Sequence, residues 1–385
     1  MDIVRLQEKL SKVPDPRRTW GNLRHKLDDI LVIGLATILC NGSDFEDMEE
    51  FGRARETELR QFLELPNGIP DESTFFRVFQ RVEPAELSGY LYSWLAEELE
   101  MQGQSVNIDG KTARGSGKKG GNATHIVSAW VGEKEIVLGQ LAVDEKSNEI
   151  TAIPKLLELF NLEGATVTID AMGCQTDIAK KIGEKGGNYI LAVKDNHKTL
   201  HCDIREYFEG LEQGDIRDLP EDVWITDEER KHGRIEKREV RSVTDIQWLP
   251  SKMDWKDLTT IIEYRCLRNG EMTNRYYISN ADMSAFEFYQ HIRGHWSIEN
   301  RLHWSLDVVF REDASQASKG HAPENLNILR KIALSLLRTA EDPRYMGKNK
   351  KMSGPKKTVR CIHEPDLHVF RPFWKVNAEA LVVRI

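Results

Sequence analysis

Two aspartates in this sequence stand at the ends of strongly apolar segments, where a carboxylate is unusual. Asp109 ends the segment that begins at Val106 and precedes a glycine, and Asp170 ends the segment that begins at Ala165. Burying an unpaired charge is costly, although one such aspartate would be explained equally well as a helix cap or turn residue. Two of them on neighbouring strands favour a shared metal site, for which carboxylate oxygens suit Mg²⁺ or Mn²⁺ rather than zinc.

A third carboxylate would have to come from a helix that packs against the same sheet. At helical spacing His295, Glu299, His303 and Asp307 share one face, and Glu299 is its central acid. This face could instead be a solvated polar stripe, or a local zinc site made by the two histidines and Glu299. Neither alternative explains Asp109 and Asp170, so the sequence favours a triad of Asp109, Asp170 and Glu299.

The elements that would position this triad follow from the pattern of apolar residues. Residues 1–100 read as helical, with caps offered at 71–74 before a helix at 75–82. From residue 105 the order becomes β-β-β-α-β-α-β. The strands are expected at 106–109, 125–131, 135–142, 165–170 and 189–193, with helices at 153–160 and 176–185. The last two strands are almost wholly apolar, as in a sheet covered on both faces. A strand-rich segment at 236–279 and helices at 285–309 and 323–338 follow.

Composition narrows the class of protein. The chain has 385 residues, of which 40% are hydrophobic and 30% charged, so a disordered or disulfide-scaffold protein is excluded and more than one domain is expected. The apolar run 30–40 is too short to span a bilayer, and the N-terminus lacks the pattern of a secretion signal. The five cysteines have no short C-x-x-C spacing. We expect a reduced, cytoplasmic chain without a membrane partner.

The charge distribution is uneven along the chain. The formal net charge of −8 weighs mildly against a protein that coats nucleic acid. The segment 301–385 nevertheless carries a surplus of seven bases, and the run from Arg344 to Arg360 contains seven bases and no acid. Such a run is either a solvated tail or an arm that binds a nucleic-acid backbone.

Six segments, in the same order along the chain, carry a specific likeness to one family. They are Ile108-Asp109-Gly110-Lys111-Thr112, the stretch from Asp144 to Pro154, Asp170-Ala171-Met172-Gly173-Cys174-Gln175, Leu191-Ala192-Val193-Lys194-Asp195-Asn196, His232-Gly233-Arg234-Ile235-Glu236 and His295-Trp296-Ser297-Ile298-Glu299-Asn300. The chain resembles the bacterial insertion-sequence transposases related to the H-repeat proteins, the ISAs family, from about residue 5 to about residue 340.

This resemblance implies an α/β fold with an RNase H-like catalytic core, in which a mixed five-stranded sheet with flanking helices carries a β-rich insertion. The expected domains are a helical N-terminal domain at 1–100, the catalytic domain at 101–340 with its insertion at about 201–280, and a basic, divergent tail at 341–385. The resemblance further implies a transposase with Asp109, Asp170 and Glu299 as catalytic residues and as ligands of two Mg²⁺ or Mn²⁺ ions. Such an enzyme cleaves transposon ends and transfers the 3′-hydroxyl into target DNA. The implied partners are double-stranded DNA, as terminal inverted repeats and target, and a second copy of the chain in a homodimer or higher oligomer.

DNA contacts are expected from a set of basic and polar residues around these motifs. They are Lys111, Lys194, Asn196, His232, Arg234, Arg238, Arg293 and His303. Related enzymes carry a Tyr-Arg-Glu-Lys pattern around the glutamate, but Ile292, His295 and Leu306 stand in the corresponding places here. Arg293 and His303 are therefore the substitutes to test for phosphate contacts.

Two other functions remain open at this point. One is a transposase-derived DNA-binding protein without catalysis, which the divergent tail would favour and the intact triad opposes. The other is an RNase H-like nuclease that cuts DNA without joining it.

Overall fold

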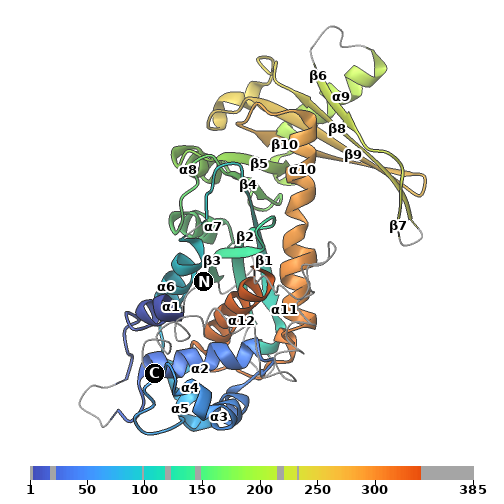
Figure 1. Cartoon of the computed structure of the whole chain (residues 1–385). Coiled ribbons are helices and arrows are strands. Elements are labelled where there is room, and N and C mark those ends of the chain that lie inside the picture. Colours follow the sequence, from blue (N-terminus) through green and yellow to red (C-terminus); the bar gives the residue numbers. More distant parts are fainter. Residues whose placement is uncertain are drawn as a thin grey trace, which may run out of the picture.

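The computed structural model describes residues 3–17, 23–97, 99–117, 123–143, 149–214, 221–231 and 234–339. The basic run at 344–360, and with it the whole predicted tail, lies outside the described residues. Figure 1 shows an elongated molecule with a helical group at one end, a strand-rich group at the other and the central strands between them.

The chain opens with six helices, as its apolar spacing predicts. They are α1 (Ile3–Leu10), α2 (Leu27–Leu39), α3 (Phe45–Ala54), α4 (Glu56–Leu59), α5 (Glu72–Phe79) and α6 (Pro84–Ala96). Asp44 caps α3 by accepting a hydrogen bond from the Asp47 amide, and Asp71 caps α5 in the same way through the Thr74 amide. Almost every residue of α2 is buried, so this helix forms the centre of the group rather than one of its surfaces.

The central sheet has the strand order of an RNase H-like fold. Its strands are β1 (Ser105–Ala113), β2 (Thr124–Val131), β3 (Ile136–Val143), β4 (Thr166–Ile169) and β5 (Asn188–Val193), in the order β3-β2-β1-β4-β5. The first three strands pair antiparallel, whereas β1, β4 and β5 are parallel to one another. Strand β1 continues four residues past its predicted end, because Gly110–Ala113 pair with β2. Part of the segment expected as a flexible loop is therefore strand.

The predicted β-rich insertion continues this sheet instead of forming a sheet of its own. Its strands are β6 (Glu221–Ile225), β7 (Glu229–Lys231), β8 (Arg234–Val243), β9 (Thr260–Arg268) and β10 (Glu271–Ser279). Strand β10 pairs antiparallel with β5, so the described strands make one ten-stranded sheet. A helix that the sequence analysis did not predict, α9 (Lys198–Gln213), leads into this part.

Helices cover both faces of the central strands. Helices α7 (Glu149–Glu158) and α8 (Thr176–Glu184) lie on the face to which Ile169 points, since a Cβ atom on Gly173 would touch both Ile169 and Ile153 of α7. On the opposite face lies a helical rod made of α10 (Ala285–His295), a π-helical segment (Ile298–His303) and α11 (Trp304–Val308) (Figure 1). The helix expected at 285–309 is thus interrupted beside Glu299.

The last described helix, α12 (Ala322–Thr339), joins the N-terminal helices to the sheet. It packs on α2, α6 and β3, and the apolar residues of all these elements belong to one hydrophobic core. Asn325 of α12 donates to the carbonyl oxygens of Phe79 (2.9 Å) and Val82 (2.8 Å). The N-terminal helices therefore share their core with the catalytic part. The domain limits at 100 and 340 stay a prediction.

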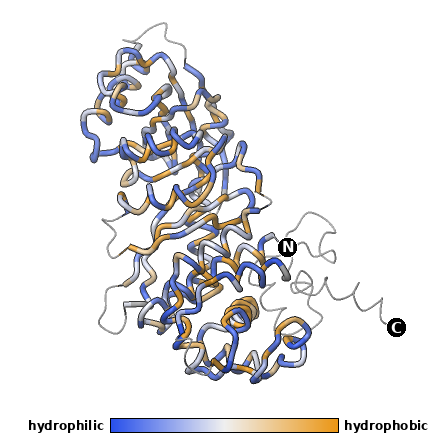
Figure 2. The backbone as a smooth tube through the Cα atoms, turned by 90° about the vertical axis from the view of Figure 1, so that its left-hand side faces the viewer, coloured by the Kyte–Doolittle hydropathy of each residue, from blue (hydrophilic) through white to orange (hydrophobic). Residues whose placement is uncertain are grey.

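Figure 2 shows hydrophilic and hydrophobic residues alternating along most of the helices, as expected where a helix covers a core with one face. Within the described residues, no helix combines the length and the apolar character that a membrane span requires. The four described cysteines, Cys40, Cys174, Cys202 and Cys266, are free thiols.

Candidate active site

The sheet brings Asp109 and Asp170 next to each other. Strands β1 and β4 run parallel with Ile108 paired to Ile169, and each aspartate is the next residue on its strand. Neighbouring strands lie about 4.8 Å apart, and residues in register point to the same face. The two carboxylates therefore stand side by side on the face that the α10 rod covers.

Glu299 approaches this pair from the rod. Helix α10 ends at His295 with Trp296 as its C-cap, and Glu299 lies in the first turn of the π-helical segment that follows. Insertions of this kind into an α-helix often occur at functional sites. Glu299 and Asp170 line a cleft of about 500 Å³ between the central strands, the rod and β10.

The electrostatics of Asp109 show that the three acids act on one another. Burial is the main factor and raises the pKa of Asp109 to about 7, and the charges of Asp170 and Glu299 raise it further. A backbone hydrogen bond from Gly110 opposes this shift. The site is thus a place where negative charge is costly and where a cation would be stabilised.

The donor chemistry of the triad fits a hard divalent cation, because all three groups offer carboxylate oxygens. The described residues nevertheless contain no group of three or more histidine, cysteine, aspartate or glutamate side chains already gathered as a metal site. The same finding offers no support for a zinc site made by His295, Glu299 and His303.

The two histidines of the rod instead contact the strands. His295 Nδ1 lies 2.9 Å from the Thr168 hydroxyl, which in turn donates to Asn107 at 2.8 Å. A hydroxyl has one proton to give, so His295 must be the donor to Thr168 and is in the Nδ1–H tautomer. His303 Nδ1 lies 3.6 Å from an Asp109 carboxylate oxygen. Burial lowers the pKa of His295 to about 4 and that of His303 to about 3, so both are neutral at pH 7.

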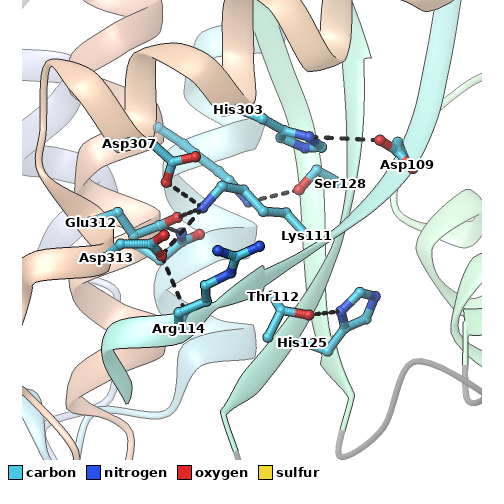
Figure 3. A network of polar contacts seen from close by, with 12 residues as sticks. Asp109, Lys111, Thr112, Arg114, His125, Ser128, His303, Asp307, Glu312 and Asp313 are labelled. Atoms are coloured by element: carbon cyan, nitrogen blue, oxygen red, sulfur yellow. Dashed lines mark hydrogen bonds and ion pairs between the residues drawn. The ribbon is translucent and has the colours of Figure 1, made fainter. Parts of the chain in front are cut away.

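A network of charged side chains lies beside the triad on the other side of His303 (Figure 3). Lys111 of β1 makes ion pairs with Asp307 of α11 (2.8 Å), with Glu312 and, more weakly, with Asp313 (3.9 Å). Glu312 is almost fully buried and also accepts from Asn327 of α12. This network connects the strand of Asp109 to the end of the rod and to α12.

The residues predicted to contact DNA fall into different surroundings. Lys194 is exposed and lines the cleft, whereas the Asn196 side chain donates to the Ala171 carbonyl at 2.7 Å and so supports the loop after Asp170. Arg293 stacks on Trp296, with 4.8 Å from its guanidinium carbon to the ring centroid.

Two further candidates are held in ion pairs within the chain. Lys111 belongs to the network just described, and Arg238 is 4% exposed and bound to Glu229 and Glu236. His303 is buried against Asp109. His232 lies outside the described residues, as does the side chain of Arg234, whose backbone forms part of β8.

Several residues that shape the site were missed by the sequence analysis. Glu149 of α7 lies 2.5 Å from His125 of β2, and this pair packs against Gly110, directly after Asp109. Lys331 of α12 is fully buried and donates to Ser128 at 2.6 Å. A signal for Lys331 was present, because Arg330 and Lys331 interrupt an otherwise apolar helix face. No comparable signal pointed to Thr168 or Asn107.

Comparison with known proteins agrees with this geometry. Residues 98–336 match the family described as Transposase DDE domain, and residues 7–95 match the family described as DDE_Tnp_1-associated. "H repeat-associated putative transposase YhhI" of Escherichia coli K12 is 38% identical over 350 residues, which cover 88% of this chain and 91% of that protein. "Putative transposase YncI" of Escherichia coli O157:H7 is also 38% identical, over 89% of each chain.

Two other similarities are more limited. "Inactive transposase YbfQ" of Escherichia coli K12 is 36% identical over 78 residues, which cover 20% of this chain and 92% of that protein. The solved piggyBac transposase synaptic complex with hairpin DNA aligns with a TM-score of 0.42 and 11% identity, over 97% of this chain and 79% of that one. The two family matches and the extended identity to H-repeat relatives show that the chain belongs to the insertion-sequence DDE transposase family, as the six motifs predicted.

Proposed function

We propose that this protein is an active DNA transposase that cleaves the ends of its element and joins the resulting 3′-hydroxyl to target DNA. The observation that carries the proposal is the placement of Asp109, Asp170 and Glu299 from three separate elements around one cleft. They lie within a region that matches a DDE transposase domain. The substrate would be double-stranded DNA carrying terminal inverted repeats.

In this proposal the three carboxylates would hold two Mg²⁺ or Mn²⁺ ions. Such ions activate a water molecule or a 3′-hydroxyl and stabilise the leaving oxygen of an in-line phosphoryl displacement. The chain's own contribution is to hold its acids in place. Asp170 accepts backbone hydrogen bonds from Met172 (3.0 Å) and Gly173 (3.3 Å), which fix one of its oxygens and leave the other free.

The neutral histidines contribute orientation. His303 approaches Asp109 without bringing a positive charge, and His295 is held by Thr168 on the strand that ends at Asp170. Both keep the rod, and with it Glu299, against the strands. The two-ended reaction requires that two element ends be handled together, so we propose that the protein acts in the bacterial cytoplasm as a homodimer or a higher oligomer on DNA.

The decisive experiment incubates the purified chain with labelled duplexes taken from both boundaries of its element, in Mg²⁺ and separately in Mn²⁺. We expect nicked ends and, with target plasmid, joined products. Asp109→Asn, Asp170→Asn and Glu299→Gln should each abolish both products. Asp177→Asn removes an exposed acid seven residues after Asp170 and should leave them unchanged.

The same gel separates the other two functions. Cleavage without joined products would support an RNase H-like nuclease. Retarded DNA without any cleavage, in wild type and Asp109→Asn alike, would support a DNA-binding protein without catalysis and would refute the proposed activity.

A further inference from the structure

Most basic side chains of the strand-rich insertion have carboxylate partners. Arg241 pairs with Glu221 (3.1 Å) and Glu263 (3.3 Å), and Arg265 pairs with Glu212 (2.8 Å). These pairs explain how an acidic segment can carry many arginines without a net positive surface. They also make an arginine that lacks such a partner informative.

Arg275 of β10 and Arg293 of α10 are two such arginines. Neither has a carboxylate within ion-pair distance in the part of the chain that the structure describes. Both guanidinium groups instead stack on the same indole, that of Trp296, with 4.9 Å and 4.8 Å from their central carbons to the ring centroid. Arg275 is exposed and Arg293 is partly exposed, so both can reach a ligand.

Two like charges gathered on one aromatic ring repel each other unless an anion lies near them. A cation–π contact contributes only about 0.5–1 kcal/mol at an exposed site, so the indole orients the guanidiniums more than it neutralises them. A planar guanidinium with donors left free is suited to bind a phosphate by two hydrogen bonds. The missing anion is therefore expected to come from outside the chain.

The position of this group indicates which anion it takes. Arg275 and Trp296 line the same cleft as Asp170 and Glu299, and Lys194 reaches that cleft from the opposite strand end, at the end of β5. No carboxylate pairs with Lys194 among the described residues either. A DNA strand whose scissile phosphate lies at the triad would place neighbouring phosphates along this wall.

We propose that Arg275, Arg293 and Trp296 form a phosphate clamp for the sugar–phosphate backbone of the reacting DNA strand. The clamp deepens the proposed transposase function and rests on it for the identity of the ligand. Because guanidinium groups already stack on the Trp296 ring, this residue organises the two arginines and does not serve as a stacking platform for a base.

The clamp also connects DNA binding to the position of Glu299. The Trp296 carbonyl accepts a hydrogen bond from the Asn300 amide at 3.1 Å, across the turn that contains Glu299. A phosphate held by both arginines would fix Trp296 and, through this bond, the start of the π-helical segment. Arg275 and Arg293 are thus binding residues, and Trp296 is a positioning residue.

The test measures binding without catalysis. Anisotropy of a fluorescein-labelled 30-base-pair duplex is followed in EDTA at several KCl concentrations, for wild type and for Arg275→Gln/Arg293→Gln. Each lost phosphate contact should lower the slope of log K against log salt by about 0.9, so we expect the slope to fall by about two and affinity to drop roughly tenfold or more. Arg275→Lys/Arg293→Lys should keep most of the slope.

The matched control is Lys180→Gln/Arg205→Gln. It removes two exposed cations that pair with acids one turn away on α8 and α9, and its slope should equal that of wild type. An unchanged slope in the Arg275/Arg293 variant, or an equal change in the control, would overturn the clamp. Thermal unfolding of each variant confirms that the fold is retained.

A second variant separates the two roles of Trp296. In the clamp, Trp296→Leu weakens duplex and single-stranded probes alike; a loss confined to probes with unpaired bases, at unchanged slope, would instead make the indole a base-stacking surface and refute our assignment. The outcome is independent of catalysis. A reduced slope with a wild type that never cuts would keep the clamp and refute the proposed function, and the reverse result would refute the clamp alone.

Discussion

Asp109→Asn should make the metal-free protein more stable while it removes activity. The pKa of Asp109 is raised from its ordinary value of 3.8 to about 7 by burial and by its acidic neighbours. A carboxyl group with a raised pKa in the folded state favours folding at low pH and loses that contribution as the pH rises through the folded value. At pH 8 the wild-type protein therefore folds against the cost of this charge, and asparagine removes the cost.

The size of the effect follows from the shift. Roughly three pKa units correspond to about 4 kcal/mol at full ionisation. The shift is shared with Asp170 and Glu299, which relax when Asp109 changes, so we expect a gain of about 2–3 kcal/mol at pH 8. This corresponds to at least about 5 °C in the midpoint of thermal unfolding. At pH 5, where Asp109 is mostly protonated, the gain should largely disappear.

The assay is thermal or urea unfolding in EDTA at pH 5 and pH 8, repeated at pH 8 with Mg²⁺ or Mn²⁺. A cation that binds the folded site should stabilise wild type by about 1–3 kcal/mol at ten to a hundred times its Kd. It should stabilise Asp109→Asn much less. The control Asp177→Asn should respond to metal as wild type does, which excludes a general effect of removing one acid.

Two results would refute this reasoning. If Asp109→Asn is less stable than wild type at pH 8 in EDTA, the carboxylate makes a favourable contact that outweighs its burial. If metal stabilises both proteins equally, the ions bind elsewhere and the triad is not their site.

Three further predictions concern contacts around the site. Lys111→Met should cost about 3 kcal/mol of unfolding free energy, because Glu312 loses its main partner in the interior; urea titration checks this against Lys26→Met, whose exposed pair with Glu64 should cost less than about 1 kcal/mol, and an unchanged salt slope for DNA binding would assign Lys111 to structure rather than to DNA contact. Asn325→Leu should cost about 2 kcal/mol or more, because two buried carbonyl groups lose their donor, and equal urea midpoints for variant and wild type would contradict it. Gly110→Ala places a Cβ atom 2.4 Å from Glu149 and from His125; the displaced pair should lower both stability and DNA cleavage, and full activity in the gel assay would show that the pair can move without cost.

The sequence predicts the parts of the fold that local patterns determine. Apolar runs of strand length gave β1 to β5 and their order along the chain, and caps such as Asp71 gave helix starts. What sequence could not predict is pairing between distant elements. Nothing in residues 271–279 says that β10 adds to β5 rather than closing a separate sheet, because both arrangements bury the same alternating face. Helix α9 was missed because it has few apolar residues and many charged ones, which also fit a solvated segment.

The candidate site divides in the same way. Asp109, Asp170 and Glu299 could be predicted because buried acids at strand ends are costly and therefore informative. Their surroundings could not be predicted, because partners such as Lys111 and Glu312 are 201 residues apart in the chain. A basic residue near a catalytic motif is as consistent with an internal ion pair as with a phosphate contact, and only the fold separates Lys111 and Arg238 from Arg275 and Arg293.

This division has a physical consequence for how the site is held. Three of the elements around the triad are joined by charges rather than by apolar contacts alone: β1 through Lys111, the end of the rod through Asp307, and α12 through Asn327, which donates to Glu312. Buried ion pairs add little net stability, but removing one member is costly, so they penalise any arrangement in which these elements are displaced. The rod is broken beside Glu299, and a break of this kind leaves the acid free to shift unless both ends are fixed. We infer that the network fixes the far end of the rod at Asp307, while the clamp at Arg275 and Arg293 would fix the near end when DNA is bound. Glu299 would then reach its working position only on the DNA complex, which agrees with a triad whose acids influence one another but are not gathered as a metal site in the free chain.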